Sequence, residues 1–144
     1  MERATFGMGC YWAAEEVFRC QPGVLATRAG FSNGRDEGVS EAEVFSGAAG
    51  HAEVVAIDFD PARISYEALL ALFWANHDAT QEAKSIVRSG IFFHDEVQRA
   101  AAEASRAAQP AAVATEVAPA GRFWLGPEKD QQYLARQAAA QAAQ

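Results

Sequence analysis

The stretch ATFGMGCYW, residues 4–12, joins a short apolar strand to the first turn of a helix. The strand is expected to end at the small residues Gly7 and Gly9. From Tyr11 to Cys20 the apolar residues recur at helical spacing, and the pair Pro22-Gly23 then stops the helix. This stretch therefore predicts a strand that runs directly into a helix, with Cys10 at the junction.

Strands and helices alternate along the remaining sequence. Further strands are predicted at Val24–Phe31, His51–Phe59, Ser89–His94 and Val113–Val117. Helices are predicted after an N-cap at Ser65, after a capping-box-like start at Asp95 and Gln98, and from Glu128 onward, with a frayed tail at Ala138–Gln144. Loops are predicted at Ser32–Gly38 and Pro119–Pro127. This pattern, without a linker, predicts one α/β (α+β) sheet domain over residues 1–144.

Composition narrows the class of protein. A chain of 144 residues that is 50% hydrophobic can bury a core of its own. The net charge of -7 makes nucleic acid and anionic membranes poor partners, and no apolar stretch is long enough to span a bilayer. A strand that begins within a few residues of Met1 leaves no room for a signal peptide, and 2 cysteines are too few for a disulfide framework. We therefore expect a cytoplasmic, reduced setting.

Cys10 is the candidate nucleophile. The first N–H groups of a helix have no partner inside the helix, and the helix dipole favours negative charge there. A thiol at this point is expected to have a lowered pKa, and the thiolate is the reactive form. Gly9 would let a substrate approach the backbone, and Tyr11 and Trp12 would offer aromatic walls beside the sulfur. The alternative is that Cys10 is a small buried hydrophobic residue.

A second motif, GAAGHAE at residues 47–53, opens the central predicted strand. His51 and Glu53 are two residues apart, so in a strand they lie on the same face. A carboxyl group facing an apolar sheet surface is expected to have a raised pKa and to act as an acid at neutral pH. The alternative for Glu53 is a solvated strand end.

At these residues the chain resembles a known family. Gly9-Cys10-Tyr11-Trp12 is similar to the Gly-Cys-Phe-Trp signature of the A-type peptide methionine sulfoxide reductases, and Gly50–Glu53 matches their Gly-His-Ala-Glu segment. Further segments resemble the family in the same order: Pro22–Val24, Gly30–Phe31, Phe59–Pro61, Ile64–Glu67, Asn76–Asp78, Arg88–Phe92 and Gln131–Leu134. The likeness covers nearly the whole chain.

The resemblance implies a ferredoxin-like sandwich with additional helices and strands, and an oxidoreductase acting on sulfur. Cys10 would attack the sulfur of a methyl sulfoxide, Glu53 would protonate its oxygen, and Tyr11 and Trp12 would form the methyl pocket. His51 would belong to the substrate site, where it orients Glu53 or holds the neighbouring loop. A Cys10 sulfenic acid would be reduced by an external thiol, either a thioredoxin-like protein or a small thiol, with no bound cofactor and no metal.

The chain also departs from the family pattern. The loop between Asp78 and Arg88 is shortened, so the family's aspartate is missing and Val87 stands where a tyrosine is expected. Counting back from Gly47 places Glu41 at a second tyrosine position. In the family the missing groups help to polarise the sulfoxide oxygen, and one hydrogen-bond donor of this kind lowers an activation barrier by about 3 kcal/mol. Either Glu41 or Lys84 replaces the missing groups, or the substrate is another S-oxide or Se-oxide. A non-catalytic binding relative is the third alternative.

No cysteine lies near the C-terminus, where many relatives keep recycling thiols. Cys20 is the other thiol. Ten residues of helix rise about 15 Å, which is too far for a direct disulfide with Cys10. Cys20 is therefore predicted to be structural.

Overall fold

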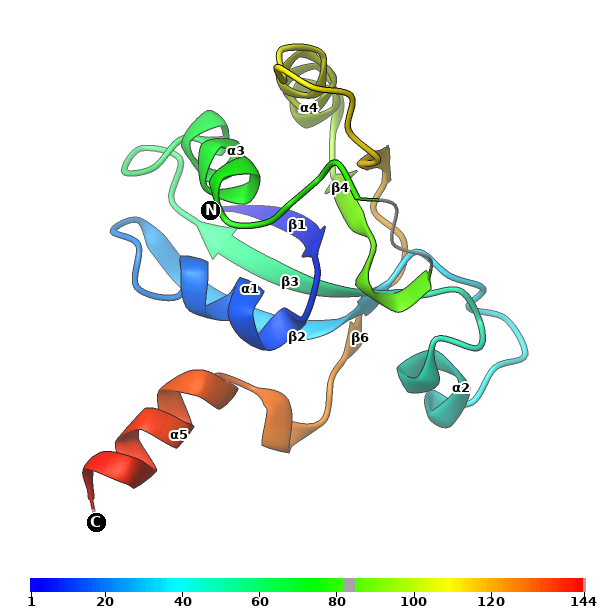
Figure 1. Ribbon diagram of the computed structural model, residues 1–144, viewed down its shortest axis with the longest axis vertical. Coiled ribbons are helices and arrows are strands. Elements are labelled where there is room, and N and C mark those ends of the chain that lie inside the picture. The colour runs from blue at the N-terminus through cyan, green and yellow to red at the C-terminus, as the bar shows by residue number, and fades with distance from the viewer. Residues whose placement is uncertain (82–84, 144) are drawn as a thin grey trace.

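The computed structural model describes residues 1–81 and 85–143, and over these residues the chain forms a six-stranded sheet in the order β5-β4-β1-β3-β2-β6 (Figure 1). The strands are β1 (Glu2–Met8), β2 (Val24–Ser32), β3 (Ala52–Phe59), β4 (Ser89–Phe93), β5 (Glu116–Pro119) and β6 (Trp124–Leu125). The helices are α1 (Tyr11–Phe18), α2 (Glu41–Ser46), α3 (Tyr66–Ala75), α4 (Glu96–Ala107) and α5 (Tyr133–Ala142), with 3-10 turns η1 (Ser85–Val87) and η2 (Glu128–Asp130).

The four central strands have the ferredoxin-like arrangement. Neighbours in the order β4-β1-β3-β2 are all antiparallel, and α1 and α3 connect β1 to β2 and β3 to β4. Strand β6 extends the β2 edge, whereas β5 lies parallel to β4 and is reached through α4. The predicted sandwich with additional helices and strands is confirmed.

The main core lies between the sheet and the helices α1 and α3, which pack side by side on one face (Figure 1). Phe6 of β1 is its centre, with ring centroids 5.6 Å from Phe18, 6.0 Å from Tyr66 and 5.2 Å from Phe73. Alternate residues of a strand share a face, so Glu53 in β3 points to the same side as the buried Val55. The fold therefore directs the Glu53 carboxyl toward α1.

The helix starts follow the local signals in the sequence. Ser65 accepts a hydrogen bond from the Ala68 N–H at 3.0 Å, and Asp95 accepts one from the Gln98 N–H at 2.8 Å. The Gln98 side chain in turn accepts from the His94 N–H at 3.0 Å. The predicted caps of α3 and α4 are confirmed.

Several boundaries differ from the sequence-based expectation. Helix α2 was not predicted, although Ser40 and Glu43 form a capping box. Strand β5 begins at Glu116 rather than at Val113, and β6 occupies part of the predicted 119–127 loop. Both short strands are defined by their pairing with the edges of the sheet, and this pairing leaves no local pattern in the sequence.

The C-terminal helix also begins later than predicted. Helix α5 starts at Tyr133 rather than at Glu128, because η2 and the left-handed backbone of Gln132 (φ 50°) come first. The described tail remains helical to Ala142 instead of fraying from Ala138. Helices α4 and α5 lie at opposite ends of the molecule (Figure 1).

Within residues 1–81 and 85–143, none of the helices combines the length and the apolar character needed to cross a membrane.

Candidate active site

Cys10 lies at the corner between β1 and α1, as its N-cap residue, and it is exposed. Its carbonyl accepts the first helical bond, from the Ala14 N–H at 3.2 Å, and its side chain makes no capping bond. Gly9 has φ +93°, and an added Cβ there would meet nothing within 4 Å. The glycine is thus needed for the left-handed backbone that turns the strand into the helix. The sulfur of Cys10 stays open to a substrate.

Glu53 meets the same helix N-terminus from β3. Its Oε1 accepts a hydrogen bond of 3.0 Å from the N–H of Tyr11, the residue directly after Cys10. The side chain is half-buried, and burial raises the pKa of Glu53; the Tyr11 N–H opposes this rise and the nearby Asp130 charge adds to it. Among the described residues this bond engages one carboxyl oxygen, Oε1, and it places Glu53 at the helix N-terminus where Cys10 is the N-cap residue.

Tyr11 and Trp12 are held by a single carboxylate. The Tyr11 hydroxyl donates to Oδ2 of Asp130 at 2.7 Å, and the Trp12 indole Nε1 donates to Oδ1 at 3.1 Å. Tyr11 meets Phe31 edge-on at 5.4 Å, while Trp12 stacks on Tyr133 at 3.8 Å. Burial, the bond to Asp130 and the surrounding negative charges raise the pKa of Tyr11, so its hydroxyl remains a donor.

An apolar cluster surrounds these two rings. Phe31 of β2 stacks on Phe45 of α2 at 4.9 Å, so the unpredicted helix contributes directly to it. The buried members are Tyr11, Ala29, Phe31 and Val44, and the partly exposed ones are Trp12, Val39, Phe45, Ile86 and Trp124. The cluster includes both residues that follow Cys10, and its partly exposed aromatic and aliphatic side chains suit an apolar methyl or methylene group of a ligand.

His51 is buried at the start of β3 and is not part of the apolar cluster around Tyr11 and Trp12. Its imidazole is fully buried, and Nε2 is 2.9 Å from Oδ1 of Asp36, which also accepts from Trp124 Nε1 at 2.8 Å. Burial raises the pKa of Asp36, but the bonds from His51 and Trp124 outweigh it and the net shift is downward. An added Cβ at Gly34 would come within 2.4 Å of the imidazole. His51 thus contacts the loop that precedes α2, not open space.

A cleft of about 270 Å³ opens beside Gly9, between the end of β1 and the turn after α3. Val87 lines it and is 40% exposed, so an aliphatic side chain occupies the position where the resemblance expects a tyrosine. Glu41 is exposed in the first turn of α2. Lys84, the other suggested replacement, lies outside the described residues.

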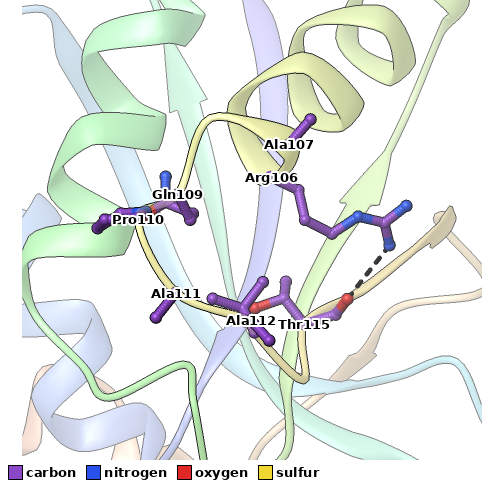
Figure 2. Close-up of a pocket in the computed structure, with 8 residues that line it drawn as sticks. Arg106, Ala107, Gln109, Pro110, Ala111, Ala112 and Thr115 are labelled. Atoms are coloured by element: carbon purple, nitrogen blue, oxygen red, sulfur yellow. Dashed lines mark hydrogen bonds between the residues drawn. The ribbon is translucent and has the colours of Figure 1, made fainter.

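A larger hollow, of about 530 Å³, lies between the end of α4 and residues 109–115 (Figure 2). Arg106 donates to the Thr115 carbonyl there at 3.3 Å, and small aliphatic side chains form much of the remaining lining. Neither Cys10 nor Glu53 reaches it. The candidate site residues Cys10 and Glu53 meet instead at the N-terminus of α1.

The two cysteines lie at opposite ends of α1, both exposed and both free. Within residues 1–81 and 85–143 no group of three His, Cys, Asp or Glu side chains is arranged to hold a metal ion. Asp130 is the site residue that the sequence analysis missed. Only its neighbours, Gln131–Leu134, carried a signal through the resemblance.

Comparison with known proteins gives consistent matches. The family model described as "Peptide methionine sulfoxide reductase" matches residues 2–144. A protein of Methanoculleus marisnigri named "Peptide methionine sulfoxide reductase MsrA" is 42% identical over 153 aligned residues, which cover 98% of this chain and 93% of that one.

Solved structures agree. Methionine sulfoxide reductase A of Corynebacterium diphtheriae superimposes with a TM-score of 0.78 at 28% identity, over 94% of this chain and 74% of the other. Reduced Mxr1 of Saccharomyces cerevisiae gives 0.80 at 25% identity, over 94% and 84%. Mxr1 has also been solved in complex with Trx2, and that structure, at 22% identity and a TM-score of 0.63 over 92% and 84%, shares the fold.

Proposed function

Because the chain belongs to the peptide methionine sulfoxide reductase family, we propose that it reduces methionine sulfoxide, with Cys10 as the nucleophile and Glu53 as the acid. One observation carries the residue assignment. The Glu53 carboxyl is bonded to the backbone N–H directly after Cys10, so the two reactive side chains share the N-terminus of α1. We propose residues 1–144 as one catalytic domain.

The first step transfers an oxygen atom from substrate to enzyme. The Cys10 sulfur attacks the sulfoxide sulfur while the free oxygen of the Glu53 carboxyl gives its proton to the sulfoxide oxygen. This attack forms a bond between the two sulfur atoms. The protonated oxygen then passes to the Cys10 sulfur while the S–S bond and the S–O bond of the substrate break, so the thioether leaves and Cys10 becomes a sulfenic acid. The raised pKa of Glu53 favours the protonated form that this step needs.

Tyr11 and Trp12 would bind the apolar part of the substrate. Their rings join the cluster of partly exposed apolar side chains beside Cys10, where a methyl group on sulfur leaves water. His51 would act from beneath, because its bond to Asp36 fixes the 32–36 loop against the start of β3. In this role His51 supports the substrate site without touching the ligand.

The second step needs an external reductant. A thiol of the reductant condenses with the Cys10 sulfenic acid, which releases water and forms a mixed disulfide. A second thiol attacks this disulfide, so that Cys10 is freed and the reductant leaves as a disulfide. We propose a thioredoxin-like protein or a small thiol in this role, in line with the Mxr1–Trx2 complex. The two free cysteines support a reducing, cytoplasmic setting.

The alternatives gain nothing from the comparisons. Neither another S-oxide or Se-oxide nor a non-catalytic binding role is favoured, because the matching proteins are named for methionine sulfoxide reduction. The absence of tyrosines at positions 41 and 87 then predicts the same reaction, with a slower protonation of the sulfoxide oxygen than in relatives that have these tyrosines.

The test is turnover of a racemic methyl sulfoxide with dithiothreitol, using free, blocked and peptidyl methionine sulfoxide. We expect one enantiomer to be consumed, the Cys10→Ser variant to be inactive and Cys20→Ser to retain the wild-type rate. If the protein reduces none of these three substrates, the proposed function is refuted.

A further inference from the structure

Residues 126–133, which we term the C-terminal strap, pack against α1. At the start of the strap, the Gly126 N–H donates to the Ala29 carbonyl of β2 at 2.9 Å. The Gln131 side chain bonds both backbone groups of Ala29 in β2, accepting from its N–H at 2.9 Å and donating to its carbonyl at 2.8 Å. The buried carboxylate of Glu15 in α1 accepts from the Gln132 N–H at 2.6 Å. The strap is thus held in register with both the sheet and the helix.

Asp130 lies between Gly126 and these two glutamines and is only 6% exposed. Each of its oxygens takes one donor, the Tyr11 hydroxyl on Oδ2 and the Trp12 indole on Oδ1. Hydrogen bonds to a charged, buried acceptor are among the stronger ones in proteins. One side chain therefore sets the orientation of both residues that follow Cys10.

We propose that Asp130 is a positioning residue for the sulfoxide reduction: it fixes the phenol of Tyr11 and the indole of Trp12 as the walls of the methyl pocket beside Cys10. The inference rests on the proposed function. Asp130 acts through the two aromatic side chains, because both of its oxygens already accept hydrogen bonds from them.

Tyr11 makes this arrangement particular to the chain. The family signature has phenylalanine at this position, and a phenylalanine ring has no hydroxyl to place on Asp130. In this chain the phenol supplies the second donor, and an added Cβ at Gly126 would lie 3.3 Å from the Tyr11 ring. The strap and the ring are therefore fitted closely.

The charge of Asp130 has a second consequence. Its carboxylate adds to the effect of burial in raising the pKa of Glu53, which keeps the proposed acid protonated over a wider pH range. Removing the charge while keeping the hydrogen bonds should therefore change the pH profile more than substrate binding. A change in the pH profile thus reports the charge of Asp130, whereas a change in KM reports its positioning of Tyr11 and Trp12.

The experiment compares Asp130→Ala, Asp130→Asn and Tyr11→Phe with the matched control Glu128→Gln, which removes an exposed carboxylate from the same turn. For each variant kcat and KM for a peptidyl methyl sulfoxide are measured across pH. The position of the Trp12 indole N–H resonance, assigned with Trp12→Phe, is recorded in the same proteins.

For Asp130→Ala we expect kcat/KM to fall about ten- to a hundred-fold with a higher KM, and the Trp12 resonance to shift. Asp130→Asn should nearly restore KM, since its amide accepts from the indole and donates to the phenol oxygen. Its kcat should decline from a lower pH, because Glu53 loses the neighbouring charge. Tyr11→Phe should have a smaller effect than Asp130→Ala, and Glu128→Gln should match the wild type.

An unchanged KM and an unchanged Trp12 resonance in Asp130→Ala would overturn the proposal. If that variant does not fold, Asp130→Asn and Tyr11→Phe decide the matter, and wild-type KM and pH profiles in both would overturn it. A wild-type protein that reduces no sulfoxide would refute the proposed function instead. The Trp12 resonance would still test the contact with Asp130.

Discussion

Glu53 is subject to opposing influences that its position in β3 creates. Burial against the helix side of the sheet raises its pKa, and the Asp130 carboxylate acts in the same direction. The Tyr11 N–H, which favours the charged form, reduces the effect without cancelling it. The net shift is upward and favours the protonated carboxyl, which is the form that the proposed proton transfer needs.

We predict that Glu53→Gln lowers kcat at pH 7 by about a hundred-fold or more, because the amide cannot supply the proton. In the wild type, activity should decline as pH rises through the raised pKa of Glu53, and this decline should be absent from the residual activity of the variant. Alkylation of Cys10 by iodoacetamide should proceed at a similar rate in both proteins.

The matched control is Glu67→Gln, an exposed carboxyl in the first turn of α3, which should leave the pH profile unchanged. Equal kcat values for the wild type and Glu53→Gln would show that the proton comes from another group.

Three strands are joined by one acidic residue on the sheet face turned away from α1. Asp58 of β3 accepts from Arg3 of β1 at 2.9 Å and from Arg28 of β2 at 3.1 Å. Burial raises the pKa of Asp58, but the two guanidinium groups outweigh it, so the pKa lies below its usual value. The ionised form of Asp58 is thus favoured by folding.

We predict that Asp58→Asn lowers the free energy of unfolding by about 1–2 kcal/mol at pH 7. A carboxyl with a depressed folded-state pKa stabilises above its unfolded pKa, and loses that contribution as pH falls through the folded pKa. The difference between wild type and variant should therefore shrink below about pH 4. Urea unfolding at pH 7 and at low pH measures both values.

Glu37→Gln serves as the control for this prediction, since Glu37 is exposed in a loop. A destabilisation by Asp58→Asn that is the same at low pH and at pH 7 would contradict the assignment to the ionised carboxylate.

Across the whole molecule, α1 keeps the two thiols apart. Cys10 precedes its first turn and Cys20 follows its end, so a direct disulfide would require α1 to unwind. A sulfenic acid on Cys10, as proposed, would therefore have no internal thiol within reach. Its reduction would then depend on a reductant that approaches the exposed Cys10 from outside.

We predict that treatment with methyl sulfoxide in the absence of reductant leaves Cys10 as a sulfenic acid that dimedone traps. Peptide mass spectrometry should find the adduct on Cys10 in equal amount in the wild type and in Cys20→Ser. A Cys10–Cys20 disulfide in the oxidised wild type would instead make Cys20 a resolving thiol.

Much of the fold follows from local patterns in the chain. The Ser65 and Asp95 caps, the helical spacing in α1 and the alternation in β3 each depend on residues a few positions apart, and the structure has them all. The short strands β5 and β6 escaped prediction, because only their partners at the sheet edges define them.

From the sequence by itself, periodicity and capping indicated alternating strands and helices, because these are local properties of a chain. The short motifs carried the resemblance to the family, and that resemblance implied the ferredoxin-like fold and the proposed pair Cys10 and Glu53. Only the tertiary structure placed Asp130 against Tyr11, 119 residues away, and buried His51 under the loop. Such contacts depend on how the whole sheet, α1 and the C-terminal strap pack together, and no short stretch of residues encodes that packing.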